Sequence, residues 1–410
     1  MRGKLHYFGR WGNSVAGELV IVDDFDRAAR DAEDEYKRDW HGIVSGRGRS
    51  AYTTGRGGKT IHDITEWFFL HNKKKQSDGE LSAFSLNEYY RVCVTVEKFF
   101  GPDRHVADLS PFDFENLRAH IGKDCTLVTL RGKINRIRVL FSHAHKYQLI
   151  DRPVSYGAAF DRPKDLHIRG ERNRAGERLF ERVDLLRMLT LTDGKPITVG
   201  DDVVTLPKSP PLRAMLLLGL NAGFGNTDVS SLPQSAVNLA TGWISFPRPK
   251  TQIQRKVPLW PETVAAITEA LVVRPAPKDP ADANLCFLTE RGTPFVRLQQ
   301  SKTNENRQVC INAIARRFEA LIRALKIDGR RGLGFYTLRH VFETVAGESR
   351  DQVSVDSIMG HVDSTMGGQY RERISEERLR AVVDHVHDWL FGPQAKPVQK
   401  SSAKSAAKSA

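Results

Sequence analysis

The stretch Tyr336-Thr337-Leu338-Arg339-His340, followed by Met359-Gly360-His361 and then by Tyr370, decides how this chain is interpreted. It gathers a guanidinium, an imidazole and a phenol within thirty-five residues. A guanidinium can hold a phosphate through two parallel N–H groups. An imidazole exchanges protons near neutral pH, and a phenol can attack phosphorus as a nucleophile. Together the three side chains predict cleavage of a phosphodiester.

The spacing of these residues resembles the C-terminal signature of the tyrosine recombinase, or phage integrase, family. That signature is an H-x-x-R-H motif, then L-G-H, then a nucleophilic tyrosine at the distance that separates Tyr370 from His361 here. Arg339 and His361 are twenty-two positions apart, and His361 and Tyr370 are nine apart. Tyr336 stands where the family has its first histidine.

The resemblance implies a role for each residue. Arg339 would clamp the scissile phosphate, His361 would donate a hydrogen bond or a proton, and Tyr370 would form a 3′-phosphotyrosine. Tyr336 can still donate a hydrogen bond to phosphate. Lys250-Thr251 resembles the family's β-hairpin lysine motif, which makes Lys250 the acid for the leaving 5′ oxygen. This chemistry uses no metal and no nucleotide cofactor.

One departure from the family pattern concerns its first catalytic arginine, which lies in a sequence like G-L-R-x-x-E-L. The corresponding stretch runs from Gly223 to Val229, and Gly225 occupies the arginine position, whereas Asp228 supplies the usual acid. Loss of one preorganised donor to an oxyanion costs about a hundredfold or more in rate. Either another cation substitutes, from Arg248, Arg255 or the pair Arg330-Arg331, or the protein binds DNA more than it cuts it.

The charge balance points to the same partner. The 410 residues include 62 Lys and Arg against 49 Asp and Glu, a formal net charge of +13, which favours a polyanion. No apolar stretch is long enough to span a bilayer, and no signal core follows the first residues. We therefore expect double-stranded DNA as the partner and a cytoplasmic, nucleoid-associated protein. The four cysteines are far apart, which indicates reduced thiols rather than a zinc site.

Composition and periodicity divide the chain into five segments. They are a small N-terminal region ending in a basic Gly/Arg linker (1–59), a helical domain (60–150), a linker rich in Pro, Gly, Arg and Asp (151–176), a catalytic domain (177–392) and a Lys/Ser/Ala tail expected to be disordered (393–410). Within the first, residues 1–22 are strand-like and residues 24–40 predict a charged helix.

The helical domain corresponds, by the resemblance, to a SAM-like core-binding domain for DNA. Its apolar periodicity predicts four helices, at 61–72, at 85–101 with Ser85 as the cap, at 110–121 and at 126–147. On the last helix Arg131, Asn135 and Arg138 fall on a face of their own, which predicts a stripe that docks on the DNA backbone. A solvated helix face explains this stripe equally well.

The catalytic domain is predicted to be mainly helical. Short β-type runs at 243–246 and 256–259 flank residues 247–251 and predict a hairpin with a basic tip, with a third strand at 286–288. Apolar residues at spacings of three and four predict an amphipathic helix at 376–390. In the family such a helix docks into a neighbouring protomer, and packing on its own domain is the alternative. The expected fold class is therefore mainly α with a small antiparallel β-sheet (α+β).

The resemblance implies site-specific DNA recombination or integration by a protein that self-associates to a dimer or tetramer on DNA. Arg248 and Arg255 on the hairpin are expected to add DNA contacts. Three alternatives stay open: a catalytically weakened DNA-binding protein on the same fold, a type IB topoisomerase-like activity, and an unrelated basic protein whose Arg, His and Tyr coincide by chance.

Overall fold

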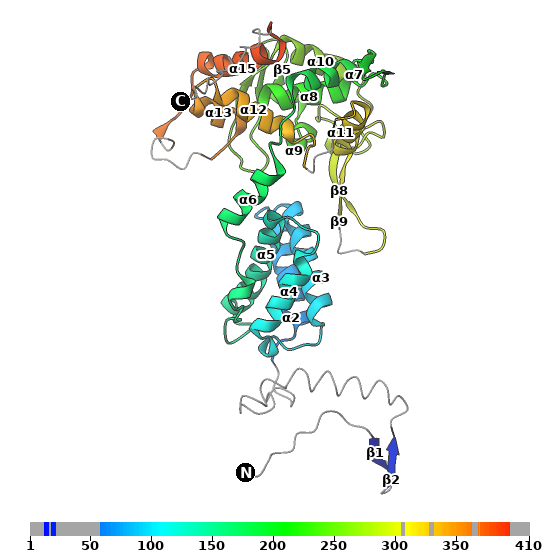
Figure 1. Ribbon diagram of the computed structural model, residues 1–410, viewed down its shortest axis with the longest axis vertical. Helices are drawn as coiled ribbons and strands as arrows, with labels where there is room; N and C mark the ends of the chain where they lie inside the picture. The colour runs from blue at the N-terminus through cyan, green and yellow to red at the C-terminus, as the bar shows by residue number, and fades with distance from the viewer. Residues whose placement is uncertain are drawn as a thin grey trace, which may run out of the picture. The chain divides into compact units, whose positions relative to one another are not determined.

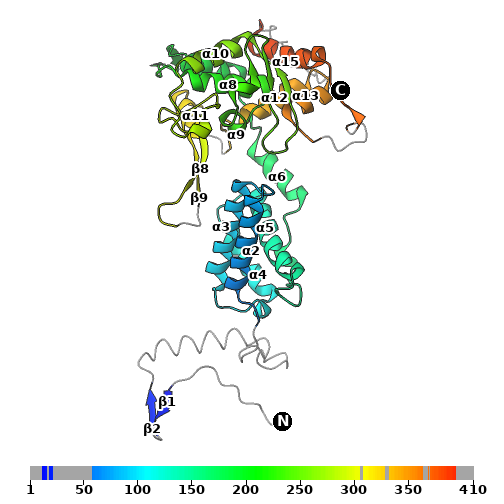
Figure 2. The same ribbon diagram turned by 180° about the vertical axis from the view of Figure 1, so that it is seen from behind.

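The computed structural model describes residues 12–15, 18–21, 58–304, 308–327, 332–362, 368 and 370–393. The chain divides into two compact units, Met1–Glu171 and Arg172–Ala410, which Figures 1 and 2 show from opposite sides. Near the N-terminus β1 (Gly12–Val15) and β2 (Glu18–Ile21) pair as an antiparallel hairpin. The helix predicted at 24–40, most of the Gly/Arg linker, the pair Arg330-Arg331 and almost all of the tail lie outside the described residues.

Four helices form the core of the first unit, as the apolar periodicity predicts. They are α2 (Ile61–Ser77), α3 (Ala83–Phe100), α4 (Pro111–Gly122) and α5 (Leu127–Lys146). Thr60 and Ser110 begin α2 and α4 with reciprocal capping boxes. The predicted cap of α3 is wrong, because the Ser85 backbone N–H donates to Ser82 Oγ (3.1 Å), and Ser82 is the N-cap.

The segment predicted as a linker at 151–176 is structured over much of its length. Phe160, in the 3-10 turn η3 (Ala158–Phe160), is fully buried and packs on Phe114 with ring centroids 5.2 Å apart. Tyr156 packs on the same ring at 4.9 Å. The helix α6 (Asp165–Ala175) follows, and its Glu171 accepts the Leu127 N–H at the start of α5 (3.0 Å). Aromatic burial rather than helical periodicity holds the first part of this segment, so the periodicity search missed it.

The second unit is built around α8 (Pro210–Ala222), in which ten residues are buried. This helix packs against α10 (Pro261–Val272) and α12 (Thr337–Gly347). The helices that complete the unit are α7 (Arg182–Thr192), α9 (Asn226–Ser230), α11 (Ala313–Ala324), α13 (Gln352–Met359) and α15 (Glu376–Phe391). Figure 1 shows α8 inside this group, with α12, α13 and α15 along one side of it.

The predicted hairpin is present as β6 (Trp243–Ser245) and β7 (Lys256–Pro258), paired with Ile244 opposite Val257. The third strand of this sheet is β5 (Val237–Asn238). The strand predicted at 286–288 is wrong: Cys286 and Leu288 are buried without strand pairing, so their apolar run marks core packing. Two hairpins were not predicted, β3 (Ile197–Val199) with β4 (Asp202–Val204) and β8 (Val296–Gln300) with β9 (Gln308–Asn312).

The amphipathic helix after Tyr370 is present as α15, and it packs on its own unit. Its five buried residues belong to the core of that unit: Leu379, Val382, Val383, Val386 and Leu390. The indole N–H of Trp260 donates to the Val383 carbonyl (3.0 Å). The alternative stated for this helix therefore holds, and its apolar face is unavailable to a neighbouring protomer while it stays packed in this way.

These elements make a mainly helical protein with small antiparallel sheets, which confirms the predicted fold class. Among the described residues, no helix is long and apolar enough to cross a membrane. The four cysteines are free thiols, and burial raises the pKa of Cys93 and of Cys286 to about 12.

Candidate active site

Arg339 is the centre of the candidate site. It lies in the first turn of α12 and is 3% exposed. Its Nη1 donates to the Gly223 carbonyl (2.7 Å), at the left-handed C-cap of α8, and its Nη2 donates to the Met359 carbonyl (2.8 Å), at the end of α13. Desolvation, and next the charge of Arg248, lowers the pKa of Arg339. A guanidinium is still charged at neutral pH, so the site holds a fixed, buried positive charge.

His361 lies directly beside this charge, with its Nε2 3.0 Å from Arg339 Nη2. Because a guanidinium has only donors, Nε2 must accept here, and the ring proton is on Nδ1. The Nδ1–H group donates a hydrogen bond to Asp356 Oδ1 (3.0 Å). The two contacts together assign one tautomer and one orientation to the imidazole.

The sequence explains how Asp356 reaches His361. Gly360 ends α13 in the left-handed conformation (φ 64°), and the His361 backbone N–H donates to the Asp356 carbonyl (2.9 Å). This is the Schellman arrangement, in which the residue after the terminal glycine returns over the last helical turn. Asp356 was not among the predicted site residues, although the pattern D-x-x-x-G-H was available as a signal.

The tip of the β6–β7 hairpin contacts the same glycine. Thr251 Oγ1 donates to the Gly360 carbonyl (3.0 Å), as does Arg248 Nη1 (3.3 Å). A Cβ at Gly360 would lie 2.9 Å from Arg248 Cβ, so only glycine fits this contact. Lys250 is exposed at the tip. The structure thus brings the hairpin next to Arg339 and His361, with Lys250 accessible to a ligand.

Gly225 and Arg255 occupy the region where the family pattern has its first arginine. The Gly225 N–H donates to Asp228 Oδ2 (2.8 Å), and Arg255 Nη2 binds Asp228 Oδ1 (3.1 Å). Arg255 is 1% exposed, and its guanidinium lies 4.2 Å from the centre of the Phe224 ring. Its Nη1 has no hydrogen-bond partner within the described part of the chain. Burial lowers the pKa of Arg255 to about 10, and the side chain cannot contact a DNA surface from this position.

Tyr370 is 78% exposed, so its hydroxyl is accessible. Within the described residues, no hydrogen bond joins it to Arg339 or to His361. The site as described therefore brings together Arg339, His361 and the hairpin tip, and it leaves the predicted nucleophile outside their hydrogen-bonded network. A cavity of about 360 Å³ adjoins His361, between α13, residues 253–254 of the hairpin and residues 371–374.

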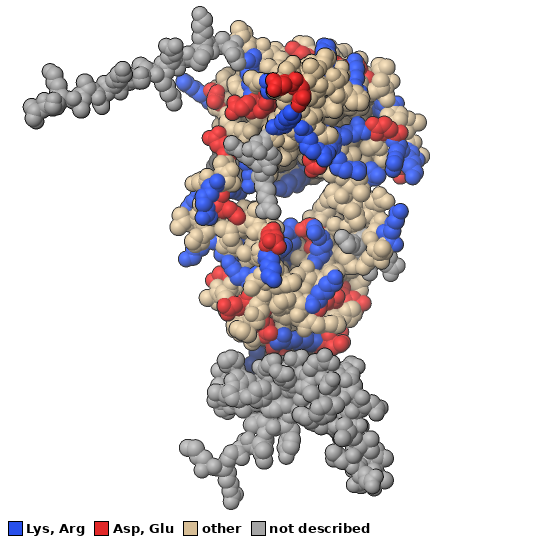
Figure 3. Space-filling model, turned by 45° about the vertical axis from the view of Figure 1, so that its right-hand side comes forward, with Lys and Arg blue, Asp and Glu red and all other residues tan. Residues whose placement is uncertain are grey.

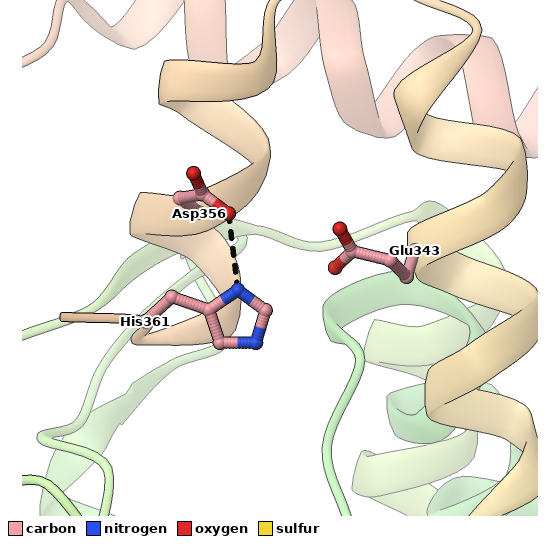
Figure 4. Close-up of side chains that lie close together, drawn as sticks. All are labelled: Glu343, Asp356 and His361. Atoms are coloured by element: carbon pink, nitrogen blue, oxygen red, sulfur yellow. Dashed lines mark hydrogen bonds and ion pairs between the residues drawn. The ribbon is translucent and has the colours of Figure 1, made fainter. Parts of the chain in front are cut away.

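Figure 4 shows the carboxylates of Asp356 and Glu343 near the His361 ring. Glu343, on α12, points toward Asp356 and His361 at the end of α13, and ligand atoms of the three residues lie within 4.8 Å of one another. Such a set could hold a divalent cation by its residue types. However, Asp356 already accepts the His361 N–H, and the Arg339 guanidinium lies 3.0 Å from the same ring. The nearby positive charge disfavours a metal ion, so the carboxylates fit the histidine and arginine better.

The residues of the predicted DNA stripe are largely engaged within the first unit. Arg131 pairs with Asp165 (2.8 Å), and Arg138 pairs with Asp161 (2.8 Å) and donates to the Phe160 carbonyl. Asn135 Oδ1 is buried with no partner among the described residues. The two arginines therefore hold residues 160–165 against α5.

A second face of α5 lines a larger cavity of about 610 Å³ between α3 and α5, which includes Arg91, Lys133 and Arg136 and no predicted catalytic residue. Figure 3 shows Lys and Arg side chains at the surface of both units in that view, interspersed with Asp and Glu.

Residues 202–378 match the model of the phage integrase family. No curated protein matches the chain.

Solved structures of integrases are similar to this chain at low sequence identity. The integrase of the Tn1549 transposon in complex with a circular intermediate DNA is 14% identical with a TM-score of 0.53, over 80% of this chain and 100% of that one. A lambda integrase dimer bound to a core site is 13% identical with a TM-score of 0.53, over 77% of this chain and 99% of that one. A lambda integrase tetramer bound to a Holliday junction is 14% identical with a TM-score of 0.53, over 89% of this chain and 93% of that one.

The family match and the shared fold support a site-specific recombinase, and they favour neither a topoisomerase nor an unrelated basic protein. The second unit therefore contains a segment similar to the phage integrase family, and the chain shares the fold of integrases of known structure.

Proposed function

We propose that this protein is a site-specific DNA recombinase that cuts and rejoins DNA through a covalent bond between Tyr370 and the 3′ phosphate. One observation carries the proposal: a buried guanidinium, Arg339, is held by two backbone carbonyls with the imidazole of His361 at 3.0 Å. This pair lies within the segment that matches the phage integrase family. A preorganised cation beside a proton carrier is what attack on a phosphodiester requires.

Arg339 would supply charge to the non-bridging oxygens of the phosphate. Its contacts use three of the five N–H groups of a guanidinium, which leaves donors for phosphate. Burial prevents water from screening the charge, so each contact to the phosphate is worth more than it would be at the surface. The exposed Lys250, on the hairpin latched to Gly360, would protonate the leaving 5′ oxygen.

Arg255 would compensate in part for the glycine at the first arginine position, through its charge and without contacting the phosphate. It is the buried cation next to Asp228, and the charges of Arg339 and Arg248 both act on it. The region also holds the carboxylates of Asp228, Asp356 and Glu343, and among these Asp228 pairs with Arg255. The buried positive charges of Arg255 and Arg339 favour an incoming phosphate.

Double-stranded DNA is the proposed partner of both units, with assembly to a dimer or tetramer on DNA. The net charge of +13 supports DNA binding. Two of the similar structures are a dimer and a tetramer of lambda integrase on DNA. Because α15 packs on its own unit, we assign assembly to surfaces other than its buried face.

A suicide duplex with a nick near the cleavage position tests the proposal. Cleavage should trap a covalent adduct of the full-length protein, because the short released strand diffuses away and cannot be rejoined. Lys250→Ala should form this adduct slowly on ordinary DNA and much faster on a 5′-bridging phosphorothiolate, whose leaving group needs no proton. A wild-type protein that binds the duplex and never forms an adduct would leave a DNA-binding function only.

A further inference from the structure

His361 contacts Arg339 through Nε2 and forms an imidazole–carboxylate pair with Asp356 through Nδ1. The family pattern has a further histidine three positions before its arginine, and this chain has Tyr336 there. A neutral phenol is a poor proton acceptor near pH 7. The chemistry proposed above still requires a group that removes the proton from Tyr370.

The hydrogen bonds around the ring leave one nitrogen suited to that task. The Nδ1–H group donates a hydrogen bond to Asp356 (3.0 Å), so Nε2 carries the lone pair. That lone pair is directed at Arg339 Nη2 (3.0 Å). A bound phosphate offers Nη2 a charged acceptor in place of a neutral imidazole, and a charged acceptor makes the stronger hydrogen bond. Phosphate binding would therefore release Nε2.

The charged groups described near the ring lie on several elements. They are Arg339 and Glu343 on α12, Asp356 on α13, Arg248 on the hairpin, and Arg371, Glu372 and Arg373 along the adjoining cavity. Glu343 Oε2 is buried with no partner among the described residues, whereas its Oε1 accepts from Gln352 (3.1 Å). The two carboxylates would stabilise the imidazolium that forms when Nε2 takes a proton.

We propose that His361 is the general base for Tyr370 and that Asp356 is the positioning residue that makes it one. As Tyr370 Oη bonds to phosphorus, its proton passes to His361 Nε2. The bond from phosphorus to the 5′ oxygen breaks, and that oxygen takes a proton from a separate acid, assigned above to Lys250. In rejoining, the 5′ hydroxyl gives its proton back to Lys250 and attacks phosphorus, the bond from phosphorus to Tyr370 Oη breaks, and the imidazolium returns its proton to the departing phenolate. This inference rests on the proposed function.

Single-turnover cleavage of the suicide duplex, measured from pH 5 to 9, tests this assignment. Asp356→Asn keeps the shape of the side chain and removes its charge. The amide can also donate to Nδ1, which would put the ring proton on Nε2, the wrong tautomer. Cleavage at the plateau should fall by about ten- to a hundredfold, within the range of general base catalysis. The midpoint of the acid limb should move to lower pH, because the imidazolium loses its counter-charge.

Matched variants separate proton transfer from structural damage. Glu262→Gln removes the carboxylate from a second pair, Glu262 with His387 (3.2 Å), which is far from the site in the sequence and lies between α10 and α15. His340→Gln removes the imidazole that packs on the Tyr336 ring at 5.6 Å. Both should keep the wild-type pH profile. His361→Ala should lose at least a hundredfold and recover with added imidazole in proportion to its unprotonated fraction.

The outcomes are distinguishable. If Asp356→Asn leaves the plateau and the acid limb unchanged, or if His340→Gln removes the limb instead, His361 is not the base and this inference fails alone. If the wild-type protein forms no adduct at any pH, the proposed function fails and takes this inference with it.

Discussion

The ring of Tyr336 lies against Gly225: a Cβ at residue 225 would be 3.1 Å from both Cδ2 and Cε2 of that ring. These are the two positions at which the chain departs from the pattern that its sequence resembles. A tyrosine at 336 fills space beside residue 225, and a glycine there leaves room for it. The two departures are thus coupled in space, and neither is expected to be reversed alone.

This contact predicts the behaviour of Gly225→Arg. As a single change it forces the arginine against the Tyr336 ring and should destabilise the protein by about 1–3 kcal/mol, as overpacking does. Combined with Tyr336→His, which shortens the facing side chain, the loss should shrink and cleavage should rise above that of Tyr336→His alone. Urea unfolding and single-turnover cleavage of the wild type, the two single variants and the double variant measure the coupling energy between residues 225 and 336. Additive effects would show that the two residues are independent.

Arg255 and Asp228 form a buried ion pair whose separation should be costly. Arg255→Met leaves the Asp228 carboxylate with the Gly225 N–H and without its cation. The free energy of unfolding should fall by about 3–5 kcal/mol, because a buried charge loses its partner. Lys326→Met, which breaks the exposed pair with Asp202, is the control and should leave the free energy of unfolding nearly unchanged. Similar losses in the two variants would contradict the burial of Arg255.

The pair Asp351–Arg378 joins α13 to α15 and should make stability depend on pH. The hydrogen bond from Arg378, more than any other contact, lowers the pKa of Asp351 from 3.8 to about 2. Because the folded-state pKa is depressed, the stabilisation is complete above about pH 4 and is lost as the pH falls toward 2. Arg378→Met should therefore be less stable than wild type at pH 6, and the difference should close toward pH 2. A difference that is constant with pH would exclude this linkage.

The packing of α15 predicts the result of truncation. Removing residues 376–410 exposes the core that Leu379, Val383 and Leu390 cover, and it removes the acceptor of the Trp260 indole. The shortened protein should not fold, as near-ultraviolet circular dichroism would show. Removing residues 394–410 instead should leave the unfolding midpoint unchanged and weaken DNA binding, because four lysines are lost. A folded 1–375 protein would mean that α15 is not part of the core.

The sequence was most informative where periodicity and special residues coincide. The stripes of α5 and α15 predicted both helices, and the apolar runs around residues 247–251 predicted the hairpin. It was least informative where aromatic packing holds irregular backbone, as at Phe160, and where a helix stop sets a side chain, as at Asp356. Arg138 and Arg131 pair with Asp161 and Asp165, which come just after Phe160 in the sequence. A stripe on α5 alone therefore could not reveal that both arginines are paired.

The identity of the residue that carries the DNA tests the account most directly. After trapping on the suicide duplex, the protein should be digested and the nucleotide-bearing peptide mapped by mass spectrometry. We expect the adduct on Tyr370, and we expect Tyr370→Phe to form none while binding the duplex with nearly unchanged affinity, because only one exposed hydroxyl is lost. An adduct on another tyrosine, such as Tyr336, or one that persists in Tyr370→Phe, would contradict the account.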